Sequence, residues 1–313
     1  MTDRPSVPGG PDPATAPGEG ALPGVIRRLL LVPDSFRSFE VDAREAAKLH
    51  RIGPDLLAEL LDRGLPHRGG AGPRLDRLDL ENVGLALRLT TPRWTAMRSW
   101  RRCLRDCSRS GPTTYRLTVR ARCPQPADHG CDLALHPRVV ASADPGTVRR
   151  TGDGFRLDLT ASAVDHRFGG PFAAVAEAVR DLDFHLLPPA LATDPSFVAR
   201  TRLADCVAAT MMLLRAGPEH GVRLRPAVGL LLTTPFPAWH QWIEVDTGRT
   251  WLAADPFLLG VFARWGIVNP GQWPVDRSPQ GVLWRCHSDA FPLVVHGDVA
   301  VRAGLALQLA GTA

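Results

Sequence analysis

PAWHQWIEVDTGRTWLAADP, residues 237–256, is the stretch that decides the fold of its surroundings. Its two arms, HQWIEV (240–245) and TWLAAD (250–255), are rich in aromatic, β-branched and other apolar residues, which is typical of strands. The residues Asp-Thr-Gly-Arg between the arms are typical of a turn. The stretch therefore predicts a β-hairpin with a polar, titratable residue at each of its open ends.

The expected register of this hairpin brings these two titratable side chains together. A four-residue loop over residues 246–249 pairs Val245 with Thr250 and places His240 directly opposite Asp255. A carboxylate bonded to one ring nitrogen fixes the tautomer of a histidine, which leaves the other nitrogen free to serve a nucleophile. A pair at the end of a sheet can also simply satisfy two polar groups. The hairpin alone leaves both interpretations open.

A helix that begins with a cysteine is predicted upstream of the hairpin. In LADCVAATMMLLRAGP (203–218) the apolar residues follow the helical period, and Asp205 is a suitable N-cap, which puts Cys206 at the first helical position. There the helix dipole favours a thiolate, and free backbone N–H groups can hold an oxyanion during acyl transfer. Position alone also allows a structural cysteine that fills the core.

The remaining sequence patterns predict an α+β protein. The last expected helices are followed by consecutive strands, an order that favours an antiparallel sheet. Besides the hairpin arms, helices are expected at 51–65, 91–107, 171–182 and 194–217, and strands at 115–123 and 226–234.

Composition divides the chain into three parts. Residues 1–24 contain 11 Pro and Gly and almost no apolar pattern, which predicts a disordered tail. The Gly-, Asp- and Pro-rich passage ADPGTVRRTGDG (143–154) is the best candidate for a domain boundary. We therefore expect an accessory region of mixed helices and strands at 25–147, suited to substrate recognition, and a second domain with the cysteine and the hairpin at 148–313.

Cys206, His240 and Asp255 together form a more specific pattern than any one of them does. They occur here within DCVAATMMLLRAG, WHQWIEV and WLAADP. With a cysteine at a helix start, a histidine that opens a strand and an aspartate before a proline, the chain resembles the transglutaminase-like superfamily of papain-related cysteine enzymes. The resemblance covers roughly residues 165–260. It implies an α+β core in which the nucleophile helix packs on an antiparallel sheet.

The resemblance also implies a role for each of the three residues. Cys206 matches the nucleophile, His240 the general base and acid, and Asp255 the residue that orients the histidine. The implied reaction is acyl transfer through a thioester on a peptide or carrier-bound acyl group, which ends in hydrolysis or in amide formation, without a cofactor. The link GPEHGVRLRPAVG (217–229) is longer and more polar than is usual in the family. The alternative is a non-catalytic scaffold of the same fold that binds a peptide or a carrier protein.

Two groups of side chains are candidates for binding the substrate. Trp239, Trp242 and Trp251 flank the motif and are candidates for lining an acyl cleft, although large core residues are the simpler interpretation. Residues 85–125 carry ten arginines and one acid, which fits an acidic peptide or carrier protein better than nucleic acid. A solvated helix face explains the same charges without any partner.

The six cysteines are expected to be reduced thiols. The sequence shows neither a signal-peptide pattern nor an apolar run long enough for a membrane span, so we expect a cytoplasmic protein without a membrane partner. A zinc site is disfavoured because no C-x-x-C pair occurs, and no metal is expected. The residues of that rejected site are Cys103, Cys107, Cys123, Cys131 and His129.

Overall fold

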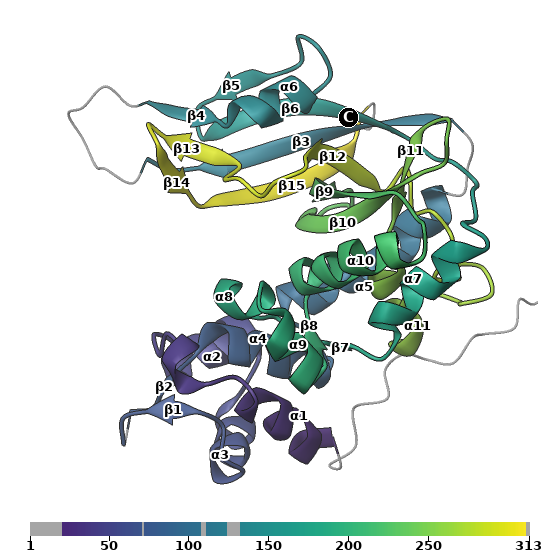
Figure 1. Ribbon diagram of the computed structural model, residues 1–313. Coiled ribbons are helices and arrows are strands. Elements are labelled where there is room, and N and C mark those ends of the chain that lie inside the picture. The colour runs from purple at the N-terminus through teal and green to yellow at the C-terminus, as the bar shows by residue number, and fades with distance from the viewer. Residues whose placement is uncertain (1–20, 71, 108–110, 124–131, 311–313) are drawn as a thin grey trace, which may run out of the picture. The chain divides into compact units, whose positions relative to one another are not determined.

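The computed structural model describes residues 21–70, 72–107, 111–123 and 132–310 (Figure 1). The chain divides after Trp94 into two compact units. The predicted boundary at 147/148 differs from this division, because it falls inside the second unit. Strands before and after position 147 pair in one sheet there, and this pairing between distant segments left no local signal in the sequence.

The first unit is a small helical assembly with one short hairpin. Its core is formed by apolar side chains such as Leu29, Ile52, Leu60 and Leu80, all of them fully buried. The elements are α1 (Ala21–Leu30), η1 (Asp34–Phe36), α2 (Ala43–His50), α3 (Pro54–Asp62), β1 (His67–Arg68), β2 (Arg74–Leu75) and α4 (Arg77–Ala86).

A buried arginine ties this unit together. The guanidinium of Arg37 donates to the carbonyls of Leu29 and Val32 at 2.7 and 2.6 Å and to Asp79 Oδ2 at 2.7 Å. Burial raises the pKa of Asp79 to about 6, against the opposing effect of the hydrogen bond and charge of Arg37. The pair therefore joins the end of α1 to α4 through a charge-assisted bond inside the core.

The second unit contains two four-stranded antiparallel sheets. The site sheet has the order β11-β10-β9-β12, and the other sheet has the order β15-β3-β6-β5. The strands of the site sheet are β9 (Leu224–Leu231), β10 (Ala238–Asp246), β11 (Trp251–Ala254) and β12 (Leu283–His287). Those of the other sheet are β3 (Pro112–Ala121), β5 (Arg149–Thr151), β6 (Gly154–Ser162) and β15 (Ala303–Leu309).

A continuous apolar core joins these two sheets. It includes Leu117 and Leu157 from the second sheet and Leu230 and Trp284 from the site sheet. Smaller elements complete this side of the unit. They are α6 (Pro137–Ser142), the sheet of β4 (Leu133–Leu135), β13 (Val294–His296) and β14 (Val299–Val301), and the parallel pair β7 (Asp183–Phe184) and β8 (Leu203–Ala204).

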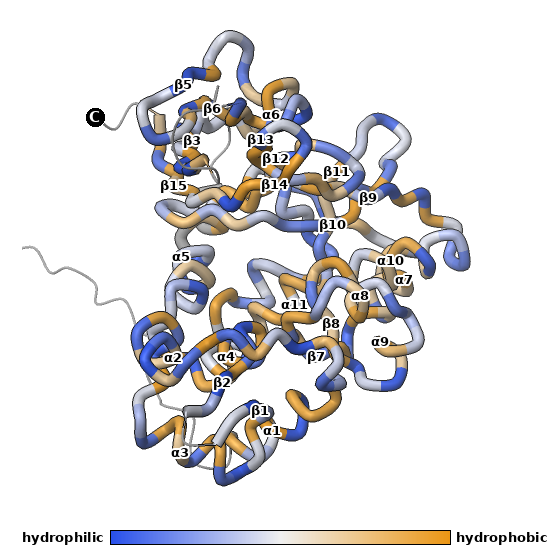
Figure 2. The backbone as a smooth tube through the Cα atoms, turned by 90° about the vertical axis from the view of Figure 1, so that its left-hand side faces the viewer, coloured by the Kyte–Doolittle hydropathy of each residue, from blue (hydrophilic) through white to orange (hydrophobic). Residues whose placement is uncertain are grey.

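Helices cover the opposite face of the site sheet. The central one, α10 (Cys206–Glu219), packs on β9 and β10 and against α7 (Pro171–Arg180), while α11 (Pro256–Arg264) packs on α7 and α10. The tube of α11 is largely orange in Figure 2, in agreement with its buried apolar residues. The remaining helices are α5 (Pro92–Cys107), α8 (Pro189–Ala192) and α9 (Pro195–Thr201).

The α+β prediction is confirmed, with two local corrections. Residues 21–24, expected in the disordered tail, belong to α1, because Leu22 is buried in the core of the first unit together with Val25. The stretch 194–217, expected to be helical, contains two helices with β8 between them, and the second begins at Cys206 as its N-cap predicts. The first helix ends at Arg202, since this residue takes the left-handed conformation at the end of α9.

The predicted hairpin forms, but its register is two residues away from the predicted one. Asp246 pairs with Trp251, so the four-residue loop covers 247–250. The loop is closed by a hydrogen bond from the Thr247 N–H to the Thr250 carbonyl. The predicted pairing of Val245 with Thr250 is therefore wrong.

The reason for the shift lies in the partners of Asp246. Its N–H donates to the carbonyl of Arg223, which extends β10 by one residue, and its carboxylate accepts the N–H of Gly248 in the turn. A shift by two residues keeps every side chain on the same face of the sheet. Asp255 therefore stays on the face of His240 but lies diagonal to it, not directly opposite.

No helix in the described part of the chain is both long and apolar enough to cross a membrane.

Candidate active site

Cys206 is the first residue of α10, as the sequence predicts. Asp205 is the N-cap, and its Oδ1 accepts the backbone N–H groups of Val207 and Ala208 at 3.0 Å each. The thiol is free and half-buried. Burial raises the pKa of the Asp205 carboxyl, while backbone hydrogen bonds oppose that rise. Asp205 thus fixes where α10 begins, and Cys206 carries its thiol at that position.

His240 and Asp255 are in direct contact, although the register of the hairpin differs from the prediction. Nε2 of His240 lies 2.6 Å from Oδ2 of Asp255, and both residues are buried. The second carboxylate oxygen, Oδ1, accepts the N–H of Leu258 at 3.0 Å, because Asp255 is also the N-cap of α11. Pro256 at the first helical position needs no partner for its nitrogen. The start of α11 therefore aims Asp255 at the imidazole.

Cys206 is the other partner of the imidazole. Burial lowers the pKa of His240, but the hydrogen bonds and charges of Asp255 and Cys206 outweigh burial and raise that pKa to about 10. Since Nε2 is bonded to Asp255, Nδ1 is the ring nitrogen that remains for the thiol. The structure thus brings all three predicted residues together, with the histidine between the cysteine and the aspartate.

The alternation of β10 separates the neighbouring tryptophans. Trp242 lies on the face of His240, is 2% exposed, and stacks with the imidazole at 6.0 Å between ring centroids. Trp239 points to the other face and packs on the apolar core, with its ring 5.2 Å from that of Phe291. Of the two cleft candidates on this strand, Trp242 packs against the His240 imidazole, whereas Trp239 is part of the core between the two sheets.

Trp251, the third candidate, lies at the far end of the hairpin. Its half-buried ring stacks under the guanidinium of Arg225 at 4.4 Å. Arg225 in turn bonds to the buried carboxylate of Glu244 at 2.6 Å, and Arg285 approaches the same oxygen at 3.2 Å. The ring thus supports an ion-pair network on the site sheet. The acid of this network, Glu244, lies two positions along β10 from Trp242.

Trp100 on α5 is a site neighbour that sequence patterns did not single out. Its ring meets the His240 ring edge-on at 6.4 Å and the Phe262 ring of α11 at 4.7 Å. Trp100 and Leu104 also border a small apolar space next to Asp255. Helix α5 therefore shields the histidine–aspartate pair from water. The helical period of α5 is visible in the sequence, but the sequence does not indicate which surface this helix covers.

The structure describes only some of the residues of the zinc site that the sequence disfavours. Cys103 is buried and Cys123 is half-buried. The side chain of Cys107, and all of His129 and Cys131, lie outside the described residues. Within the described part of the chain, no three His, Cys, Asp or Glu side chains are grouped so as to hold a metal ion.

Neither a protein-family model nor a curated protein matches this sequence.

Proposed function

We propose that the protein is a cysteine-dependent acyl transferase or hydrolase of the transglutaminase-like class, with a papain-like α+β core. The observation that carries the proposal is the position of the His240 imidazole between Asp255 and Cys206. Nucleophile, base and orienting group are the three parts that acyl transfer through a thioester needs. Helix α10 packed on an antiparallel sheet fits the core of that class.

The chemistry follows from this geometry. Nδ1 of His240 takes the proton of the Cys206 thiol, and Sγ attacks the carbonyl carbon of an amide, an ester or a carrier-bound thioester to form a C–S bond. His240, protonated at Nδ1, gives that proton to the leaving group as its bond to the carbonyl carbon breaks. In the second half, His240 takes a proton from water or an amine, which attacks the thioester and releases Cys206.

One backbone group is placed to stabilise the oxyanion. Two N–H groups in the first turn of α10, those of Val207 and Ala208, already donate to Asp205. We therefore assign the oxyanion to the N–H of Cys206 itself, together with the positive end of the helix dipole. From the sequence alone, all the free N–H groups at the start of this helix were candidates for holding the oxyanion.

The non-catalytic scaffold is disfavoured by the energetics of the site. Burial of a carboxylate and of an imidazolium costs on the order of several kcal/mol of desolvation each, and a binding scaffold gains nothing from placing a thiol beside them. A peptide or a carrier-bound acyl group is the proposed substrate.

Site-selective alkylation distinguishes the two functions. We expect iodoacetamide at neutral pH to modify Cys206 at least about tenfold faster than Cys123, which is also half-buried, with the sites resolved by peptide mapping. In His240→Gln this preference should disappear. If Cys206 reacts no faster than Cys123 in the wild-type protein, the enzyme proposal fails and the scaffold remains.

A further inference from the structure

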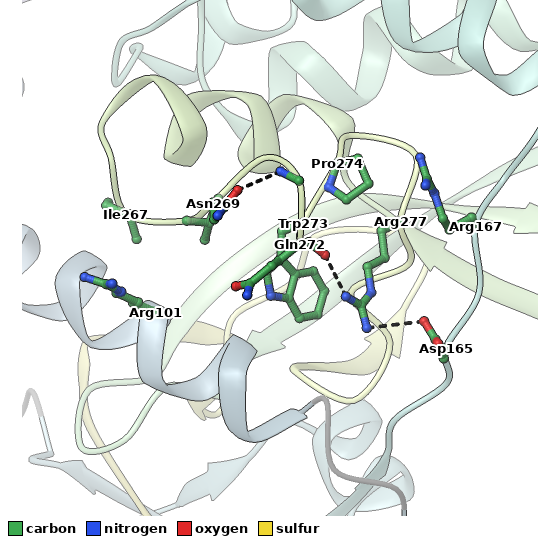
Figure 3. A pocket seen from close by; sticks show the side chains of 11 residues that line it. Arg101, Asp165, Arg167, Ile267, Asn269, Gln272, Trp273, Pro274 and Arg277 are labelled. Carbon is green, nitrogen blue, oxygen red and sulfur yellow. Dashed lines mark hydrogen bonds and ion pairs between the residues drawn. The ribbon is translucent and has the colours of Figure 1, made fainter. Parts of the chain in front are cut away.

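The second unit contains a pocket of about 610 Å³ that the proposed reaction does not use (Figure 3). It lies between α5 and the loop of residues 265–278 that follows α11. Its volume is in the range of pockets that bind small ligands or a few residues of a peptide. Arginine is the dominant charged lining residue, with Arg101, Arg167 and Arg277 against the single acid Asp165.

The loop that forms one wall of the pocket is held in place before any ligand arrives. The N–H groups of Gln272 and Trp273 donate to the carbonyl of Asn269 at 3.0 and 2.8 Å. At the end of the loop, Ser278 Oγ donates to the carbonyl of Ala253 at 2.7 Å, which ties the loop to β11. A preformed wall lowers the entropic cost of binding.

Arg277 is oriented on this wall. Its guanidinium lies 4.3 Å from the centre of the Trp273 ring, and Nη1 donates to the Gln272 carbonyl at 2.6 Å. Its ion-pair partner Asp165, at 3.2 Å, has a side chain that is 86% exposed. Such a solvated pair is weak, so a carboxylate from a ligand can replace Asp165 at small cost.

Arg101 faces the pocket from the other side. Figure 3 shows it on α5, with Gln272 and Trp273 between it and Arg277. Its side chain is exposed, and no ion pair joins it to a carboxylate among the described residues. Other members of the arginine-rich stretch are neutralised within the chain, such as Arg116 by Asp158 at 2.9 Å. Arg101 is thus an arginine of that stretch that both lines the pocket and has its charge available to a ligand.

The composition of the pocket favours a peptide over a phosphate group. Its positive groups stand on opposite sides and do not converge on one point, as the three oxygens of a phosphate would require. The lining also includes the apolar side chains of Ile267 and Pro274 and the amides of Asn269 and Gln272. Oδ1 of Asn269 accepts the N–H of Gly271, which leaves its NH2 group as a donor.

We infer that this pocket binds an acidic peptide segment, with one carboxylate at Arg101 and a second at Arg277. Side-chain amides pair with the peptide backbone between the two carboxylates, and the apolar wall contacts the intervening side chain. The inference does not require that Cys206 be catalytic. The test therefore uses Cys206→Ser, which cannot process the probe, so that failure of the binding site and failure of the proposed reaction are distinguishable.

The test measures fluorescence anisotropy with a labelled (Glu-Gly)4 peptide. We expect Cys206→Ser to bind this peptide at least about tenfold more tightly than labelled (Gln-Gly)4, a difference of about 1.4 kcal/mol. Adding Arg101→Glu should weaken binding of the acidic peptide about tenfold or more, and Gln272→Ala should weaken it to a smaller extent. The matched control is Arg149→Glu on β5, an exposed arginine outside the pocket, which should bind as Cys206→Ser does.

Three results would overturn the inference. The first is that binding of the acidic peptide is undetectable. The second is that Arg101→Glu and Arg149→Glu reduce the affinity for this peptide equally, which would show that only the net charge matters. The third is displacement of the acidic peptide by inorganic phosphate at constant ionic strength, which would assign the pocket to phosphate instead.

Discussion

Oδ2 of Asp255 lies 2.6 Å from Nε2 of His240, while the other oxygen of the same carboxylate caps α11. One side chain therefore links the start of a helix to the orientation of an imidazole on the neighbouring strand. The N-cap bond of Oδ1 holds the carboxylate in place, so Oδ2 is a fixed hydrogen-bond partner for the imidazole. A fixed partner keeps the ring oriented, as the proposed reaction requires.

Asp255→Asn tests this link. The amide oxygen can still accept the N–H of Leu258, but the NH2 group can only donate to Nε2, which places the ring proton on Nδ1. A neutral imidazole of that tautomer cannot accept the proton of Cys206. We expect the alkylation rate of Cys206 to fall by about 10²-fold or more, in line with the loss of a correct tautomer in similar sites. Asp153→Asn, at an exposed ion pair, should leave the rate unchanged.

The raised pKa of His240 predicts a pH dependence of stability. The pKa in the folded protein, about 10, exceeds the ordinary value of 6.5 expected in the unfolded chain. The contribution is therefore complete below about pH 6.5 and is lost as the pH rises through about 10. We expect the difference in free energy of unfolding between wild type and His240→Gln to shrink from pH 6 to pH 10 in urea titrations. A difference that grows over this range would contradict the assignment.

Trp100→Ala tests the role of α5. Removal of a tryptophan that is only 5% exposed should cost about 3–5 kcal/mol of unfolding free energy. Water then reaches the His240–Asp255 pair and weakens it, so the alkylation of Cys206 should slow as well. Trp100→Phe keeps a ring against Phe262 and should restore most of the rate. If Trp100→Ala loses stability and Cys206 reacts as in the wild type, α5 has only a structural role.

Arg37→Met tests the buried pair of the first unit. Without the guanidinium, Asp79 is left as a buried carboxylate, and stability should fall by about 3–5 kcal/mol at neutral pH. Because the pKa of Asp79 is already about 6 in the presence of Arg37, it should rise further in the variant. Protonation then relieves the cost, so the loss should be smaller at pH 5 than at pH 8. Arg37→Met/Asp79→Leu should recover much of the stability at both values.

Local signals in the sequence were sufficient for parts of the site. Asp205 predicts the start of α10, because an N-cap depends only on its own side chain and the next few N–H groups. The common face of His240 and Asp255 follows from the two-residue period of strands, which survives a shift by two. The pairing itself was mispredicted, because Asp246 is held in β10 by a bond to the carbonyl of Arg223, the residue before β9.

Other features depend on contacts between distant segments and could not be predicted. Trp100 precedes His240 by 140 positions, and an amphipathic pattern does not say which surface its apolar face will meet. The boundary after Trp94 was missed for a similar reason, since β3 lies early in the chain and pairs with β15 near its end. The wall of the arginine pocket is a loop, and its shape arises from hydrogen bonds rather than from periodicity.

Formation of an acyl-thioester on Cys206 is the most direct test of the proposed chemistry. The protein is mixed with excess p-nitrophenyl acetate, release of p-nitrophenolate is followed in a stopped-flow instrument, and the acetylated residue is identified by mass spectrometry. The proposal predicts a burst of about one equivalent with the acetyl group on Cys206, absent in Cys206→Ser and strongly slowed in His240→Gln. A wild-type protein that shows no burst and carries no acetyl group on Cys206 would contradict it.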